Sequence, residues 1–273
     1  MMTIPAGVGT LDYFPCRYGT SRAVFRGPAR SLARPYIAVL GGSATFGKYV
    51  EQPFACLVEQ ALGAPVANLG ALTAGVDFYL SDPPVLEVAA RAEVAVVQVT
   101  GAEALSNPFY SVHSRRNDRF LAATPALRAL FPQVDVADIH FTRHLLQVLK
   151  RSDESAYARV VQGLKAAWLD RMRQLLAQLP KRRVLLWMAD APPPDRAETL
   201  DPAPPFIDRT MLDALRPEVD EVVIATPSAR ARSLAPFDMI YPETEAALAA
   251  CLPGAAMHAE VAAELAPVVQ GLL

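Results

Sequence analysis

The segment "IAVLGGSATFGKYVEQPF", Ile37 to Phe54, sets the class of the chain. Its first four residues are a short apolar run, which is typical of a strand buried on both faces of a parallel sheet. A glycine-rich turn with Ser43 follows, and Pro53 suits the first turn of the next helix. A strand that leads through a turn into a helix indicates an α/β protein and places Ser43 at the sheet edge where such proteins bind ligands.

The rest of the chain repeats this alternation. Apolar runs predict further strands at 65–70, 93–101, 182–190 and 219–226. Helical patterns lie at 53–63, 82–92, 136–179 (broken near 151–155) and 259–273 (interrupted late by Pro267). We predict a three-layer α/β/α sandwich with a central, mainly parallel sheet of about five strands and a helical insertion after strand three.

We expect one α/β domain over residues 1–273. Within it, residues 1–34 are expected to form an irregular N-terminal extension, because they are basic and carry no clear periodic pattern. Residues 102–180 are expected to form a loop and helical insertion, whose first part is polar.

The composition excludes several classes of protein. Hydrophobic residues make up 52% of the chain and charged residues 20%, which indicates a globular protein rather than a disordered one. A net charge of −2 and a pI near 6.1 give no reason to expect nucleic acid as a partner. The three cysteines, Cys16, Cys56 and Cys251, lie far apart, which argues against a disulfide framework or a structural zinc site.

The N-terminal residues lack the charged and apolar regions of a signal peptide, and no apolar run reaches the roughly 18 to 20 residues that span a bilayer. We therefore expect a cytoplasmic protein with no membrane span. The expected partner is a small-molecule or glycan substrate, without a cofactor, and homo-oligomer formation stays open.

The turn after the first strand has three interpretations. From Gly42 it reads G-x-x-x-x-G-K, one residue short of a phosphate-binding P-loop. Gly47 and Lys48 fit that motif, but Tyr49 stands where a compact Ser or Thr would bind Mg²⁺. In the second interpretation Ser43 is a nucleophile exposed on the turn, and a third, structural interpretation makes it a helix-capping serine.

The nucleophile interpretation is supported by a resemblance. "GGSATFG" resembles the first block of the SGNH (GDSL-type) hydrolases, with Ser43 at the position of the nucleophilic serine and Gly42 where the family often has Asp. The "NLG" after the second strand looks like the second block, and the resemblance then implies that the Gly70 N–H helps to hold the oxyanion.

The other two blocks of that family depart from its pattern. Gly101 fits the third block, but Glu103 stands where the family has Asn, and the nearest amide is Asn107. His258 lies where the family has its catalytic base, while Ala255 stands in place of the orienting Asp. The resemblance implies catalytic roles for Ser43, Gly70, Asn107 and His258, with His258 held by a backbone carbonyl or by another carboxylate such as Asp190 or Glu260.

The insertion carries basic and aromatic residues in "NPFYSVHSRRNDRF". Because it follows a central strand, it could overhang Ser43, and arginine binds anionic groups well. We therefore assign substrate-binding roles to Gly42, His113, Arg115, Arg116 and Arg119. A solvated basic loop or an oligomer contact is the structural alternative.

A second feature of the insertion is "HFTRH", which spaces His140 and His144 by four residues. On a helix this spacing puts two imidazoles on one face, as in zinc-binding helices. No third ligand is apparent and Phe141 replaces the glutamate of the metalloprotease motif, so we expect no metal.

Three functions remain open at this point. The first is a serine esterase, acyl hydrolase or O-acyltransferase that acts through Ser43 on an ester-bearing, anionic or carbohydrate substrate. The second is an inactive SGNH-like protein that binds an anionic glycan or metabolite. The third is a nucleotide-binding protein that uses "GGSATFGK".

Overall fold

The computed structural model describes residues 9–33 and 35–273. Its centre is a five-stranded parallel sheet with the strand order β2-β1-β3-β6-β7. The strands are β1 (Ile37–Leu40), β2 (Val66–Asn68), β3 (Val94–Gln98), β6 (Arg183–Met188) and β7 (Glu221–Ala225). The predicted parallel sheet of about five strands is confirmed, and each predicted strand contains one of these five.

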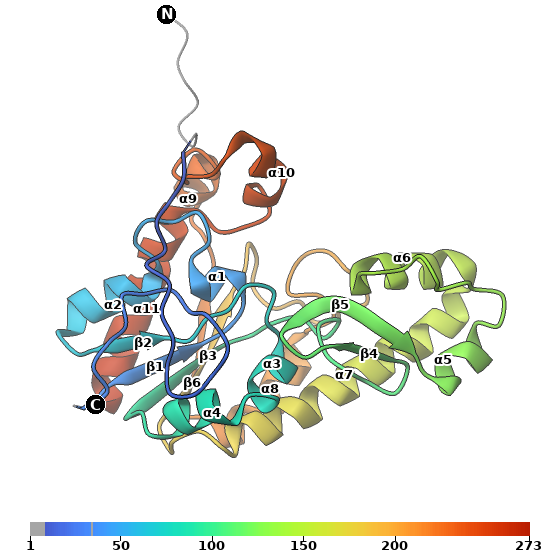
Figure 1. The fold of residues 1–273 in the computed structure, drawn as a ribbon, viewed down its shortest axis with the longest axis horizontal. Coiled ribbons are helices and arrows are strands. Elements are labelled where there is room, and N and C mark those ends of the chain that lie inside the picture. Colours follow the sequence, from blue (N-terminus) through green and yellow to red (C-terminus); the bar gives the residue numbers. More distant parts are fainter. Residues whose placement is uncertain (1–8, 34) are drawn as a thin grey trace, which may run out of the picture.

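Helices cover both faces of this sheet (Figure 1). One face packs against α2 (Phe54–Leu62) and α11 (Ala255–Leu272). The other packs against α3 (Val76–Leu80), α4 (Pro83–Ala90), α7 (Glu154–Leu176) and α8 (Arg209–Asp213). In β1, Ile37 and Val39 face the first set of helices, and Ala38 and Leu40 the second. Because neighbouring strand residues point to opposite faces, apolar residues at every position produce the predicted α/β/α sandwich.

The insertion after β3 begins with a β-hairpin that the sequence did not reveal. It consists of β4 (Tyr110–His113) and β5 (Arg116–Ala123), which pair antiparallel. The pairing has two register irregularities, both in β4. Buried and exposed residues do not alternate regularly along β5, so its sequence shows no strand pattern. The hairpin is followed by α5 (Pro125–Leu130), α6 (Thr142–Ser152) and α7. The break between the last two helices falls at Asp153, as predicted, and the Asp153 side chain caps α7 by accepting from Ala156 N–H at 2.9 Å.

Between β7 and α11 the chain forms short helices. These are α9 (Ala229–Leu234), the 3-10 helix η2 (Glu243–Glu245) and α10 (Ala246–Ala249), while the 3-10 helix η1 (Arg216–Glu218) precedes β7. In Figure 1, α9 and α10 lie on the side of the sheet where α1 (Ser43–Phe46) follows β1. The predicted interruption of the last helix was wrong: α11 continues through Pro267 to Leu272. Pro267 is exposed, so the carbonyl that loses its partner can be hydrated.

The described part of the N-terminal segment, residues 9–33, contains no helix and no strand. Phe25 and Tyr18 are nevertheless buried in the core, and an isolated β-bridge joins Cys16 to Phe25. In the described residues, every helix is too short or too polar to cross a membrane.

Candidate active site

A cleft of about 980 Å³ opens at the carboxyl ends of the strands. Its inner wall includes Gly42, Ser43 and Thr73, together with the residues from Gln98 to Gly101. Segments that are distant in the sequence form the remaining walls: Glu103 and Ala104 after β3, residues 141–144 around the start of α6, residues 203–205, and residues between Pro227 and Met257. The cleft therefore lies where the parallel sheet predicts a ligand site.

Ser43 lies on the inner wall of this cleft, in the first turn of α1. Gly42 is the N-cap of that helix and no side chain caps it, so Ser43 is not a capping serine. Its Oγ accepts a hydrogen bond from the Thr73 N–H at 3.0 Å. Thr73 has φ of 58°, in the left-handed region, where a β-branched residue is strained. The strained backbone thus directs an N–H at the serine hydroxyl.

Gln98 fixes the turn that carries Ser43. Its Oε1 accepts from the N–H groups of Gly42 (3.1 Å) and Thr45 (3.2 Å) and from the Thr45 hydroxyl (2.6 Å). Gln98 is the single polar residue in the apolar run of β3, and this is the sequence signal that could have identified it. The Gly42 N–H is consequently bonded to protein, although Gly42 itself lines the cleft.

Gly70 does not direct its N–H at Ser43. That N–H donates to Asn68 Oδ1 at 2.9 Å, and the Asn68 amide donates to the Thr45 carbonyl at 2.9 Å. A Cβ on Gly70 would collide with the backbone of Thr45 and Phe46, so glycine is required here for close packing against α1. The N–H that donates to Ser43 Oγ is that of Thr73, three residues further on.

His258 is completely buried in the first turns of α11. Its Nδ1 accepts from the Phe54 N–H at 3.1 Å, and its ring stacks on Phe54. Burial, with a further contribution from the charge of Arg26, lowers its pKa to about 3, so the ring is neutral. Because the accepting Nδ1 carries no proton, the proton lies on Nε2, which has no hydrogen-bond partner in the described chain.

The proton of His258 is on the opposite ring nitrogen from the one that a serine nucleophile requires. A histidine that takes the proton of a serine through Nε2 must carry its own proton on Nδ1. The bonds in the structure join Ser43 to Thr73 and His258 to Phe54, so these two side chains do not meet. Glu260, suggested above as an orienting carboxylate, instead accepts from Ser228 N–H at 2.8 Å.

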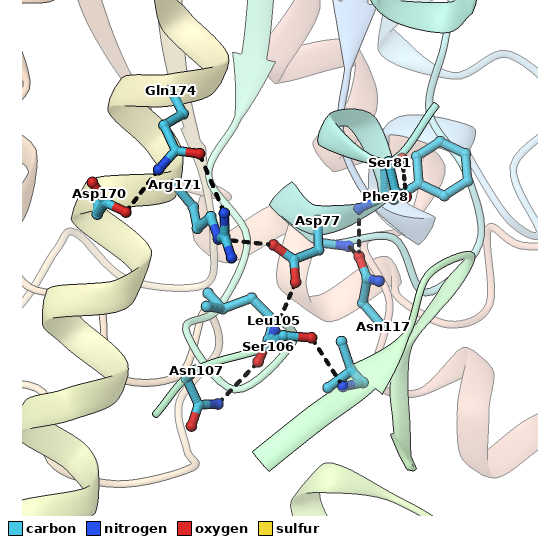
Figure 2. Close-up of polar contacts among 12 residues, drawn as sticks. Asp77, Phe78, Ser81, Leu105, Ser106, Asn107, Asn117, Asp170, Arg171 and Gln174 are labelled. Carbon is cyan, nitrogen blue, oxygen red and sulfur yellow. Dashed lines mark hydrogen bonds and ion pairs between the residues drawn. The ribbon is translucent and has the colours of Figure 1, made fainter. Parts of the chain in front are cut away.

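Asn107 shapes its own loop. Its Oδ1 accepts from Phe109 N–H at 2.9 Å and its Nδ2 donates to the Leu105 carbonyl at 3.0 Å. Figure 2 shows this loop held to α3 and α7: Asp77 accepts from Ser106 N–H at 2.7 Å and pairs with Arg171 at 3.4 Å. Asn107 is absent from the walls of the cleft.

Asn117 of β5 anchors the hairpin to the domain. It is fully buried, and its Oδ1 accepts from the N–H groups of Gly75 (2.7 Å) and Phe78 (3.0 Å) at the start of α3 (Figure 2). Its Nδ2 donates to the His113 carbonyl at 2.9 Å. The asparagine in the "RRND" string is therefore a structural residue that the sequence did not identify.

We expect Asn117→Ala to lower the free energy of unfolding by about 2 kcal/mol, because it leaves buried N–H groups without a partner. Urea denaturation measures this change. Arg116→Ala, at the exposed neighbouring position, is the control and should change the free energy by less than about 0.5 kcal/mol. Equal effects of the two substitutions would contradict the anchoring role.

The basic residues of the hairpin do not line the cleft either. His113 Nδ1 accepts from Arg115 N–H at 3.1 Å, and Arg116 pairs with Asp118 at 3.5 Å. Arg119 stacks on the ring of Phe141, which does line the cleft, so it supports the wall from behind. The turn of the hairpin lies against the end of α3, where the Ser81 hydroxyl donates to the Ser114 carbonyl at 3.2 Å.

The P-loop interpretation fails on the same turn. The N–H groups of Gly42 and Thr45 that a phosphate would need are bonded to Gln98. Lys48 pairs with Glu245 at 3.2 Å and lies over the Tyr49 ring, and the Tyr49 hydroxyl donates to Glu245. Lys48 and Tyr49 therefore attach the segment before α10 to the turn instead of binding a nucleotide.

His140 and His144, whose spacing suggested a zinc-binding helix, do not lie on one helix. His140 precedes Phe141, the N-cap of α6, so only His144 lies on the helix. Across residues 9–33 and 35–273, no group of three His, Cys, Asp or Glu side chains is placed to hold a metal ion.

Glu103 is the residue that the structure brings into the cleft and that sequence reasoning left without a role. Its Oε2 is buried and has no hydrogen-bond partner among the described residues. Desolvation, which outweighs a hydrogen bond from its own N–H and the nearby charge of Arg143, raises its pKa to about 7. The signal in the sequence was its place two residues after Gly101, at the carboxyl end of the central strand.

Comparison with known proteins assigns this chain to a family. One family model matches residues 1–273, the whole chain. The chain belongs to that family, Domain of unknown function (DUF6473). No curated protein matches the chain.

Two solved structures resemble this chain loosely. A carbohydrate esterase family 2 enzyme with a carbohydrate-binding domain, from Corynascus thermopiles (Myceliophthora fergusii), has 13% identity and a TM-score of 0.44 over 90% of this chain and 68% of its own. A gut microbial diltiazem-metabolizing enzyme has 14% identity and a TM-score of 0.36 over 81% of this chain and 46% of its own.

Proposed function

We propose that this protein is a Ser43-dependent acyl-transfer enzyme, an ester hydrolase or an O-acyltransferase that acts on an ester-bearing small molecule or glycan. The observation that carries the proposal is the hydrogen bond from the strained Thr73 N–H to Ser43 Oγ, on the wall of a large cleft. Strain of this kind costs on the order of 1–3 kcal/mol and is concentrated at functional sites.

The chemistry follows from this geometry. Ser43 Oγ attacks the ester carbonyl, the carbonyl oxygen becomes an oxyanion, and the alcohol leaves after the C–O bond breaks. The Thr73 N–H, already within hydrogen-bond distance of Oγ, is the backbone donor best placed to stabilise the charge that develops beside it. This assigns to Thr73 the role that the sequence gave to Gly70, and His258 is not available as the proton acceptor.

Covalent labelling tests this function. A fluorophosphonate probe should label the wild-type protein at Ser43, identified by peptide mass spectrometry, and Ser43→Ala should abolish the labelling. Ser81→Ala, which removes the hydroxyl of an exposed residue outside the cleft, should leave the labelling intact. An unlabelled wild-type protein, or labelling that survives Ser43→Ala, would refute the proposal.

The buried and neutral His258 favours a second candidate, a protein that binds a ligand in the cleft without acyl transfer. Arg143 and Arg232 line the cleft and would contact an anionic group. Thermal stabilisation by acetylated or carboxylated sugars, measured with a protein that no fluorophosphonate labels, would favour binding alone.

A further inference from the structure

The cleft needs a group that can take the proton of the Ser43 hydroxyl. Serine is a weak nucleophile unless a base accepts that proton, and His258 faces Phe54 with its accepting nitrogen. The base must therefore come from another residue that the cleft exposes to Ser43.

The loops that follow β1 and β3 bring Ser43 and Glu103 to the same cleft. The two strands are neighbours in the sheet, and each loop starts at its carboxyl end. The segment 73–75 contacts both loops: the Thr73 N–H donates to Ser43, and Gly75 packs so closely on Ala104, the neighbour of Glu103, that a Cβ would collide with the Ala104 carbonyl oxygen. Both Ser43 and Glu103 line the cleft.

The surroundings of the Glu103 carboxyl group do not stabilise its negative charge. Its Oε2 has no donor among the described residues and is shielded from water, while the residue as a whole is partly exposed to the cleft. A carboxylate in such a place accepts a proton more readily than one in water. Because its pKa of about 7 lies near neutral pH, it can be ionised before the reaction and still take up a proton during it.

We propose that the Glu103 carboxylate is the group that accepts the proton from Ser43, so that this cleft works with a serine and a glutamate. This inference rests on the proposed acyl-transfer function. As Ser43 Oγ bonds to the acyl carbon, its O–H bond breaks and the proton goes to Glu103. Glu103 then gives this proton to the leaving alcohol oxygen. In the second half of the reaction Glu103 takes a proton from the attacking water or acceptor alcohol and gives that proton to Ser43 Oγ as the acyl–serine bond breaks.

Groups from several elements lie near Glu103, and two of them affect the charge state of its carboxyl group. Arg143 of α6 favours the charged form of the carboxyl, while Asp201, paired with Arg143 at 2.8 Å, opposes it. The Tyr110 hydroxyl of β4 donates to the Glu103 carbonyl at 2.9 Å. The other charged or titratable residues on the cleft walls are Asp118, His144, Asp190, Arg232 and Cys251.

The pH dependence of fluorophosphonate labelling tests the role of Glu103. In the wild type the labelling rate should rise about tenfold per pH unit and level off above pH about 7, as Glu103 ionises. Glu103→Gln keeps the size of the side chain but cannot take a proton. We expect it to lower the rate at pH 8 by roughly 100-fold or more and to remove the inflection.

Two variants and a folding measurement complete this experiment. Asp118→Asn, a second cleft carboxylate with an unpartnered oxygen, should retain the inflection near pH 7, and Glu103→Asp should shift it and recover part of the rate. Circular dichroism verifies that each variant is folded. An inflection that persists in Glu103→Gln, or a wild-type rate that falls as the pH rises through 7, would overturn the role of Glu103 while leaving Ser43 as the nucleophile. Absence of labelling in the wild type would instead refute the acyl-transfer function itself.

Discussion

At pH 7, His258→Ala is expected to lower the free energy of unfolding by about 4 kcal/mol. Removing a buried ring leaves a cavity between α11 and α2, for which large aromatic truncations cost about 3–5 kcal/mol. It also leaves the Phe54 N–H at the start of α2 without its acceptor. Urea denaturation followed by circular dichroism measures the change.

His258→Asn separates this structural role from a catalytic one. The asparagine Oδ1 can occupy the place of the imidazole Nδ1 and accept from Phe54 N–H, so this variant should be more stable than His258→Ala. If His258 is structural, its folded fraction should label with the fluorophosphonate at a rate within about threefold of wild type. A loss of 100-fold or more would restore His258 as the base and contradict its orientation in the structure.

Acidification gives a further check on His258. Its pKa is about 3 when folded and near 6.5 when unfolded, so below pH 6.5 only the unfolded state gains the proton. The free energy of unfolding of the wild type should therefore fall by about 3 kcal/mol between pH 7 and pH 4 from this residue alone. The same titration of His258→Asn should lack this contribution.

Glu103→Gln is expected to stabilise the protein at alkaline pH, by about 2 kcal/mol at pH 8. The folded protein holds the Glu103 proton up to pH about 7, whereas the unfolded chain releases it near its ordinary value of 4.5. Stability therefore falls as the pH rises from 4.5 to 7, and above 7 the folded state carries the full cost of a desolvated charge. Partial exposure to the cleft reduces that cost below the one implied by the pKa difference alone.

Below pH 4.5 the carboxyl is protonated in both states, so Glu103→Gln should be nearly neutral there. Denaturation with urea at pH 4, 6 and 8 measures the three values. A variant less stable than wild type at pH 8 would mean that Glu103 makes a favourable ionic contact instead of carrying an unsatisfied charge.

The sequence alone determined the layered architecture. Runs such as "IAVL" and "VAVVQ" are apolar at every position, and only a strand covered on both faces buries both sets of side chains. The same local reasoning placed Ser43 at the carboxyl edge of the sheet and the helix break before Glu154. Each of these features depends on residues that are close together in the sequence, so the local pattern of apolar and polar residues is enough to predict it.

The tertiary structure alone decided which groups surround Ser43. The N–H that donates to Ser43 is that of Thr73, whose φ is positive, whereas the Gly70 N–H donates to Asn68. His258 has its accepting nitrogen on Phe54, 204 residues away along the chain, and no spacing in the sequence encodes that orientation. The environment of Glu103 likewise arises from packing between separate loops, because desolvation depends on all the atoms that exclude water and not on sequence neighbours.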